Sequence, residues 1–285
     1  MSSDFEWHFG DEFPEDEPQG KQAEQPRWRR LIPWLLTLLV VAAGATIWWR
    51  DRQRNLAEAE AEVEQVAQLE LQALTEGDSE LYLSLQDYYD RSWKRAQAAY
   101  VDTAGLPLPL QDVTTPVSTS VEGARVVGDR ARVEVVHTTT LPSGEEAIFR
   151  AVRFYRYMPD GRWMHTNADP DAVGGTVTFV VDEVEITALD EDADWVNPLA
   201  GELAAAADRF CNLASCGREP SVALNLAANL EEGAEPDDDI LPAPFLMGAP
   251  ENEAALEAWK ASLTNFLVDR LVAQEIRAQP DDEHS

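Results

Sequence analysis

Basic residues are scarce in this sequence. Of its 285 residues, 53 are Asp or Glu and only 22 are Lys or Arg, which gives a formal net charge of −31. Such a chain repels phosphate backbones, whose neutralisation is the main source of nucleic-acid affinity. We therefore expect no nucleic-acid partner. The acidic runs at 190–194 and 237–239 lack the ordered Asp/Asn/Gly loop of a calcium site, so we expect no bound metal either.

Cysteine and histidine are also scarce. The two cysteines, Cys211 and Cys216, cannot by themselves supply the four ligands of a structural zinc site. Their spacing fits a local disulfide in an oxidising compartment, or two reduced, partly buried thiols in a reducing one. No motif in the chain demands a nucleotide, a metal or catalysis. We therefore expect no cofactor and name no catalytic residue.

One long hydrophobic run stands out against the acidic background. Residues 31–49 read LIPWLLTLLVVAAGATIWW without a charge, with tryptophans near both ends and arginines on both flanks. A run of roughly 18 or more such residues predicts a transmembrane helix, hence a single-pass protein in contact with the lipid bilayer. A signal peptide fits less well, because basic residues follow where small cleavage-site residues should be. The slight excess of basic residues before the run predicts a cell-membrane protein with a cytoplasmic N-terminus and an extracytoplasmic C-terminal region.

The composition divides the chain into five regions, and the overall class we expect is α+β. The five regions are a disordered acidic tail (1–30), the transmembrane helix (31–49), an α+β domain (50–174), a smaller α/β unit (175–279) and a disordered tail (280–285).

The α+β region begins with helix-forming sequence and then changes period. Residues 54–75 carry an apolar stripe at helical spacing, Gly77 suits a left-handed cap, and a second helix is expected to run to about Tyr100. From Val113 the apolar residues alternate, as they do in strands, and LPSGEE and MPDGR mark turns. This order predicts helices packed on a curved antiparallel sheet.

The ordered set of motifs over residues 55–174 resembles a known family. A helix, a GD break, a helix with a tryptophan, then GDRARVEV and VRFYRYMPDGRWMHT resemble the nuclear transport factor 2-like superfamily, SnoaL-like branch. The resemblance implies a cone-shaped domain with a pocket between sheet and helices. Members of the superfamily include isomerases, hydrolases and many non-catalytic binding modules, so the resemblance alone selects no activity.

Six residues are candidates for lining such a pocket: Tyr89, Trp93, His137, Arg153, Tyr155 and Trp163. The aromatic members suit a hydrophobic core as well as a ligand cage, and the arginine suits an ion pair as well as an anionic ligand. His137 shares a strand face with Val133 and Val135, and as a general base it would need a carboxylate within hydrogen-bond reach. The turns place His137 opposite Phe149 and His165 opposite Arg156, roughly 23 Å apart along the strand, so these two histidines cannot form one site.

The order of elements in region 175–279 faintly resembles the opening half of zinc metallopeptidase-like domains found on some bacterial membrane-anchored proteins. The helix that would carry the HExxH motif reads SLTNFLVDRLVAQ and has no histidine. The resemblance therefore implies a degenerate scaffold rather than a peptidase.

Three functions remain open from the sequence. The first is a membrane-tethered, non-catalytic binding or interaction module, displayed at the cell surface, for an unknown protein or small molecule. The second is a hydrolase- or isomerase-type enzyme that uses the cone pocket with His137 as base. The third is a degenerate metallopeptidase-like scaffold.

Overall fold

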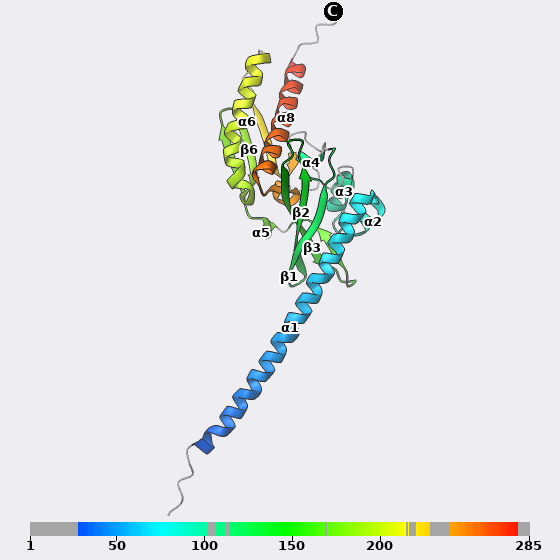
Figure 1. The fold of residues 1–285 in the computed structure, drawn as a ribbon, viewed down its shortest axis with the longest axis vertical. Helices are drawn as coiled ribbons and strands as arrows, with labels where there is room; N and C mark the ends of the chain where they lie inside the picture. Colours follow the sequence, from blue (N-terminus) through cyan, green and yellow to red (C-terminus); the bar gives the residue numbers. More distant parts are fainter. Residues whose placement is uncertain are drawn as a thin grey trace, which may run out of the picture. The chain divides into compact units, whose positions relative to one another are not determined.

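The computed structural model describes residues 28–101, 106–111, 114–168, 170–214, 216, 221–228 and 240–278. The chain forms two units, residues 1–53 and residues 54–285, and a single helix, α1 (Trp28–Glu76), continues from the first into the second (Figure 1). Most of the two predicted disordered tails, residues 1–27 and 279–285, lies outside the described residues.

The predicted transmembrane helix is the main correction. Within the part of the chain that the structure describes, no helix is both long and apolar enough to cross a membrane. The prediction of a transmembrane helix at 31–49 is therefore wrong. The predictions drawn from it, namely the bilayer contact, the single-pass topology and the cell-membrane localisation, are wrong with it.

The second predicted helix is two helices, α2 (Ser79–Ser84) and α3 (Arg91–Tyr100). Gly77 has the expected left-handed backbone at φ 72°, and the Asp78 carboxylate caps α2 by accepting from the N–H of Leu81. The break between α2 and α3 has a specific cause. Asp90 caps a new helix by accepting from the N–H of Trp93, and the intervening chain bonds to β4 instead of continuing the helix.

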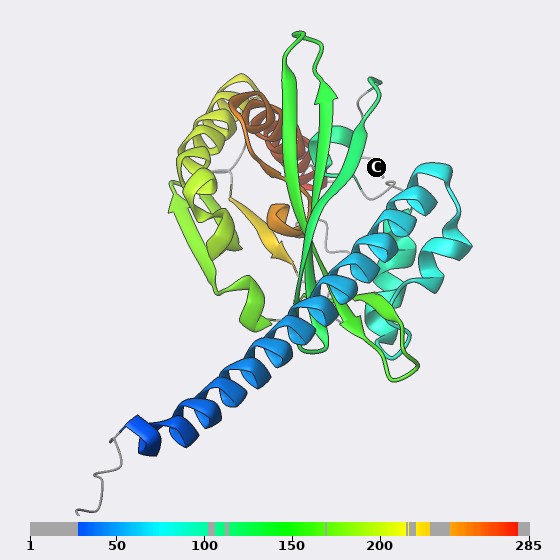
Figure 2. The ribbon, with the colours of Figure 1, turned by 60° about the horizontal axis from the view of Figure 1, so that its bottom comes forward.

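The first sheet is the predicted antiparallel meander, in the order β1-β2-β3-β4 (Figure 2). Its strands are β1 (Ser118–Val127), β2 (Arg130–Thr140), β3 (Glu146–Tyr157) and β4 (Trp163–Thr166). Both predicted turns are present, and His137 lies opposite Phe149 as expected. His165 lies opposite Tyr155 instead of Arg156, so six residues of strand, or about 20 Å, separate the two histidine positions.

The second sheet has the order β5-β6-β7-β8. Its strands are β5 (Thr176–Val181), β6 (Val184–Leu189), β7 (Val222–Ala228) and β8 (Ile240–Pro242). The first two pair antiparallel, whereas β6, β7 and β8 pair parallel, with the long helix α6 (Ala193–Ala214) as the crossover between β6 and β7. The α+β class is confirmed, and the boundary between regions 50–174 and 175–279 stays a prediction.

The remaining elements are short, apart from the last helix. They are α4 (Leu108–Gln111), α5 (Pro170–Val173), the 3-10 turn η2 (Asp190–Asp192), α7 (Pro244–Met247), β9 (Ala249–Pro250) and α8 (Glu253–Ala278). The short strand β9 adds to the first sheet beside β3. Segments distant in the sequence therefore complete the meander.

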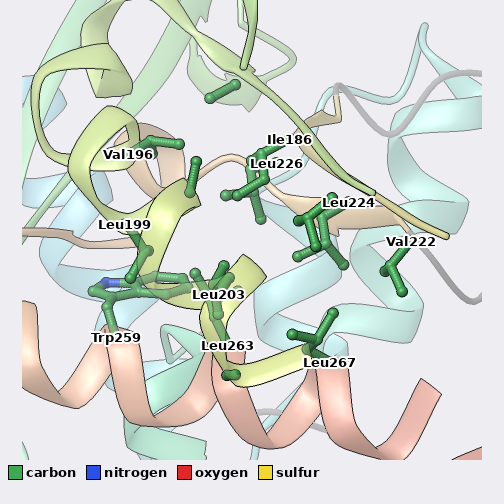
Figure 3. Close-up of a cluster of buried hydrophobic side chains, with 14 of the residues drawn as sticks. Ile186, Val196, Leu199, Leu203, Val222, Leu224, Leu226, Trp259, Leu263 and Leu267 are labelled. Atoms are coloured by element: carbon green, nitrogen blue, oxygen red, sulfur yellow. The ribbon is translucent and has the colours of Figure 1, made fainter. Parts of the chain in front are cut away.

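The two largest clusters of buried apolar side chains among the described residues hold these layers together. The larger packs α6 and α8 against the second sheet, with Leu203, Trp259 and Leu263 fully or almost fully buried (Figure 3). The smaller packs the C-terminal half of α1 on β1–β4 through Val63, which lies on the predicted apolar stripe, and through Ala67. We call the space between α1–α3 and the inward face of β1–β4 the cone interior. It is the place where the predicted pocket should lie.

Candidate functional site

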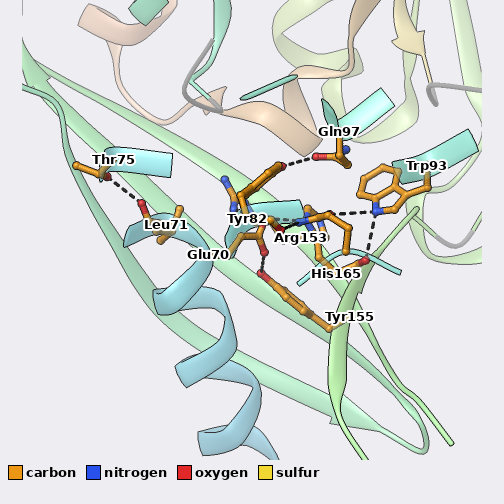
Figure 4. Close-up of polar contacts among 10 residues, drawn as sticks. Glu70, Leu71, Thr75, Tyr82, Trp93, Gln97, Arg153, Tyr155 and His165 are labelled. Carbon is orange, nitrogen blue, oxygen red and sulfur yellow. Dashed lines mark hydrogen bonds and ion pairs between the residues drawn. The ribbon is translucent and has the colours of Figure 1, made fainter. Parts of the chain in front are cut away.

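A buried carboxylate occupies the cone interior. Glu70 of α1 is 0% exposed and faces the sheet. Its Oε1 accepts a hydrogen bond from Nη1 of Arg153 at 2.8 Å, and its Oε2 accepts one from the Tyr155 hydroxyl at 2.7 Å (Figure 4). Nδ1 of His165 lies 2.8 Å from Oε1, although the geometry of this contact falls short of an aligned hydrogen bond. Three groups from β3 and β4 therefore converge on one carboxylate from α1.

The electrostatics of this cluster keep the carboxylate ionised. Burial by itself would raise the pKa of Glu70, but attraction to His165 and Arg153 and the hydrogen bond from Tyr155 lower it to about 2. Burial and the adjacent Glu70 charge raise the pKa of Tyr155 well above its ordinary value, so the phenol stays protonated and donates. The Glu70 carboxylate is thus neutralised by side chains of the same chain and does not need a ligand as its partner.

Aromatic rings close the cluster on its other sides. The His165 ring stacks on Tyr155 at 5.2 Å between centroids and meets Trp93 edge-on at 5.0 Å. Nε1 of Trp93 donates to the backbone oxygen of His165 and to Gln86. The Tyr82 hydroxyl donates to Gln97. All these side chains are buried, so Trp93, Arg153 and Tyr155 are packed core groups in this structure.

His137 lies apart from this cluster, toward the other end of β2. It is 1% exposed, and its Nδ1 is 3.0 Å from the Thr119 hydroxyl, its hydrogen-bond partner. Burial and the positive charge of Arg153 lower its pKa to about 3, so the ring is neutral near pH 7. Nε2 is buried without a hydrogen-bond partner among the described residues. The carboxylate partner that a general base would need is likewise not among its contacts in the described part of the chain.

The last two candidates lie in different places again. Trp163 is buried beside Tyr157, and its Nε1 has no hydrogen-bond partner among the described residues. Tyr89 is 61% exposed on the connection between α2 and α3. Of the six predicted residues, the structure therefore brings three together, places His137 and Trp163 toward opposite ends of the sheet, and leaves Tyr89 on the surface.

The acidic residue at the centre of the cluster, Glu70, was not predicted as a site residue from the sequence, because α1 is rich in glutamate. A signal was present: Glu70 lies seven residues after Val63 and four after Val66, on the apolar stripe. A second missed residue is Asp87, whose side chain is 1% exposed and which bonds to Arg156 and Thr166 at 2.5 and 3.2 Å. Asp87 borders a surface cavity rather than the cone interior.

The remaining candidate chemistry concerns the cysteines and metals. Cys211 and Cys216 are joined by a disulfide at the end of α6, where the Cys216 N–H also bonds to the Cys211 carbonyl. Within the described ranges, no three His, Cys, Asp or Glu side chains gather closely enough to hold a metal ion.

Comparisons with known proteins add little to this geometry. No family model and no curated protein matches the chain. One solved structure that it resembles is Δ5-3-ketosteroid isomerase from Mycobacterium sp., at 21% sequence identity, over 40% of this chain and 96% of that one, with a TM-score of 0.26. The isomerase has a cone fold of the nuclear transport factor 2-like type.

Proposed function

We propose that this chain is a non-catalytic binding or interaction module whose cone interior is a structural core. The observation that supports the proposal most is the Glu70 cluster. Its carboxylate is completely buried, and both oxygens are engaged by groups of the same chain. A reaction site needs groups that can reach a substrate, whereas these are already committed to one another.

The state of His137 supports the same proposal. The enzyme alternative makes this histidine the general base, and a base needs access to the proton it removes. His137 is 1% exposed and its identified partner is a hydroxyl. One observation favours the alternative: Nε2 is neutral and has no hydrogen-bond partner among the described residues, as a resting base would be.

Chemical modification of histidine separates these two functions. We would treat the full-length folded protein with diethyl pyrocarbonate, which acylates accessible neutral imidazoles, and locate the products by peptide mass spectrometry. A structural core predicts that His137 and His165 stay unmodified until urea unfolds the protein, which serves as the reactivity control. Modification of His137 in the folded protein at the rate seen in urea would overturn the proposal and favour an accessible pocket.

A further inference from the structure

The second sheet has an unpaired edge along β5. β5 is the end strand in the order β5-β6-β7-β8, so only one of its two sides faces another strand of the sheet. The N–H of Asp190 donates to the Gly175 carbonyl, and in an antiparallel pair every second residue bonds to the neighbouring strand in this way. Thr176, Thr178 and Val180 therefore direct their backbone N–H and C=O groups away from β6. No hydrogen bond from the described part of the chain reaches these groups.

The side chains of β5 leave this edge open to a partner. Its sequence is TVTFVV, without a charge, and its pairing with β6 has no bulge. Thr176, Thr178 and Val180 are exposed, Val180 by 66%. Phe179 and Val181 point to the opposite face, where they pack against the larger core and stay only half-buried. An added strand would therefore meet a row of backbone donors and acceptors and a partly uncovered apolar face.

Other sheet edges in the described structure are protected. β8 has three residues and ends at Pro242, which cannot donate to a further strand. β1 carries a bulge, and the Glu64 carboxylate accepts a hydrogen bond from the N–H of Ala124 on this strand. On the far side of the first sheet, the chain between α2 and α3 bonds to His165 of β4. Bulges, prolines, charges and covering segments are the usual means by which proteins block an edge, and β5 shows none of them among the described residues.

Acidic residues lie at both ends of β5. Residues 163–208, which include β5, β6 and most of α6, contain eleven Asp or Glu and no Lys or Arg. Asp182 and Glu183 form the turn at one end of β5. Asp190 and Glu191 follow β6 at the other end, and all four residues are exposed. A second copy of the chain would bring this acidic segment against itself, whereas a basic segment would be attracted to it, so charge favours a basic partner over self-pairing.

We propose that β5 binds an extended segment of a partner protein as an added strand, and that this segment is basic at both ends. Hydrogen bonds to the backbone of Thr176, Thr178 and Val180 would hold the segment, and its side chains would alternate between the two faces of the sheet. Apolar side chains would cover Phe179 on the core face, and lysines or arginines at the ends would lie near the acidic residues. The inference goes beyond the proposed function, because it names an interaction surface and a partner and does not depend on the cone interior.

Fluorescence anisotropy with the full chain tests this surface. The probe is a labelled peptide with blocked termini, Lys-Val-Thr-Val-Thr-Val-Lys. One control peptide has glutamate in place of both lysines, and the other is N-methylated at its valines and threonines, which removes the backbone donors. We expect the basic peptide to bind at least about tenfold more tightly than either control and to lose affinity as the salt concentration rises. Equal affinities for the basic peptide and either control, or no measurable binding of any peptide, would overturn the proposal.

Variants of the edge locate the binding. Val180→Lys places a like charge beside the basic peptide, so it should weaken binding by at least about tenfold. Val127→Lys is the matched control, because Val127 is 70% exposed on β1 of the first sheet, and it should leave the affinity unchanged. Thr178→Pro removes an outward N–H without breaking the ladder to β6 and should also weaken binding, whereas Thr178→Val keeps this N–H and should not. Equal affinities for Val180→Lys and Val127→Lys would refute the site, whether or not Thr178→Pro folds.

Self-pairing and the closed core are tested separately. Light scattering of the full chain at rising concentration would detect a dimer, and a dimer without binding of the basic peptide would overturn the basic partner. If the peptide fails to bind while His137 stays protected from modification, the edge site is refuted and the non-catalytic core stands. If His137 is readily modified while the peptide binds, the closed core is refuted and the edge site stands.

Discussion

Replacing His137 with glutamine should remove an acid sensitivity from the fold. His137 is almost completely buried, and its pKa is lowered to about 3 by burial and by the Arg153 charge, from an ordinary value of 6.5. A histidine whose pKa is depressed by folding must stay neutral in the folded protein, whereas in the unfolded chain it takes up a proton below about pH 6.5. Its contribution to stability is therefore complete above that pH and is lost as the pH falls toward 3.

The size of this loss follows from the shift. One pKa unit corresponds to 1.36 kcal/mol, so lowering the pH from about 7 to about 4 should cost the wild-type protein about 3 kcal/mol through His137 alone. The His137→Gln variant has no such group. We expect it to be less stable than wild type near pH 7, and we expect the difference to shift in its favour by about 3 kcal/mol near pH 4.

Urea unfolding followed by tryptophan fluorescence at the two pH values measures this difference. All other titrating groups are common to the two proteins and cancel in the comparison. Thr119→Val is the matched control, because it removes the Nδ1 partner and keeps the buried imidazole, so it should retain the wild-type pH dependence. Parallel pH dependences for wild type and His137→Gln would refute the reasoning, because they would mean that the folded protein lets this ring become protonated.

Three further predictions concern other buried groups. Glu70→Gln should lower the free energy of unfolding by about 3–5 kcal/mol, because it breaks the buried ion pair between Glu70 and Arg153. Glu62→Gln on the exposed side of α1 should change it little, and equal urea midpoints for the two variants would contradict this. Burial raises the pKa of Asp192 to about 6, so this carboxyl favours the folded state at low pH and loses that effect as the pH rises through 6. The stability of Asp192→Asn relative to wild type should therefore improve by about 2 kcal/mol between about pH 4 and pH 7. A difference in the free energy of unfolding that stays constant with pH would refute the assignment. Reducing the Cys211–Cys216 disulfide should lower the free energy of unfolding by about 2 kcal/mol, as expected for a short closed loop. Thermal melts with and without reductant would measure this loss. Cys211→Ser is the control, because its melt should not respond to reductant.

The parts of the fold that depend on neighbouring residues were predictable. The Gly77 cap, the stripe through Val63 and the pairing of His137 with Phe149 all follow from periodicity and turn chemistry within short stretches of chain. The break between α2 and α3 was not foreseen, because it depends on hydrogen bonds to His165 on a distant strand. Local propensity cannot report such a partner.

The candidate site was less predictable for the same reason. Trp93, Arg153 and Tyr155 were predicted as candidates for lining a pocket, and the structure buries all three side chains. Whether they line an open pocket depends on what fills the space between them. Glu70 fills it, from a helix whose many acidic residues hid the one that points inward. The apolar run at 31–49 shows the opposite failure, where composition alone indicated a spanning helix that the described structure does not support.

The central claim is that the cone interior is a closed structural core, and the titration of the His137 ring tests it most directly. NMR of the isotope-labelled full chain, followed from about pH 8 to pH 5, would report the protonation of this imidazole through its ring carbon and nitrogen shifts. The closed core predicts that the His137 signals stay at neutral-ring values across this range, in keeping with a pKa of about 3. A titration with a midpoint near the ordinary value of 6.5 would show that solvent reaches the ring and would contradict the account.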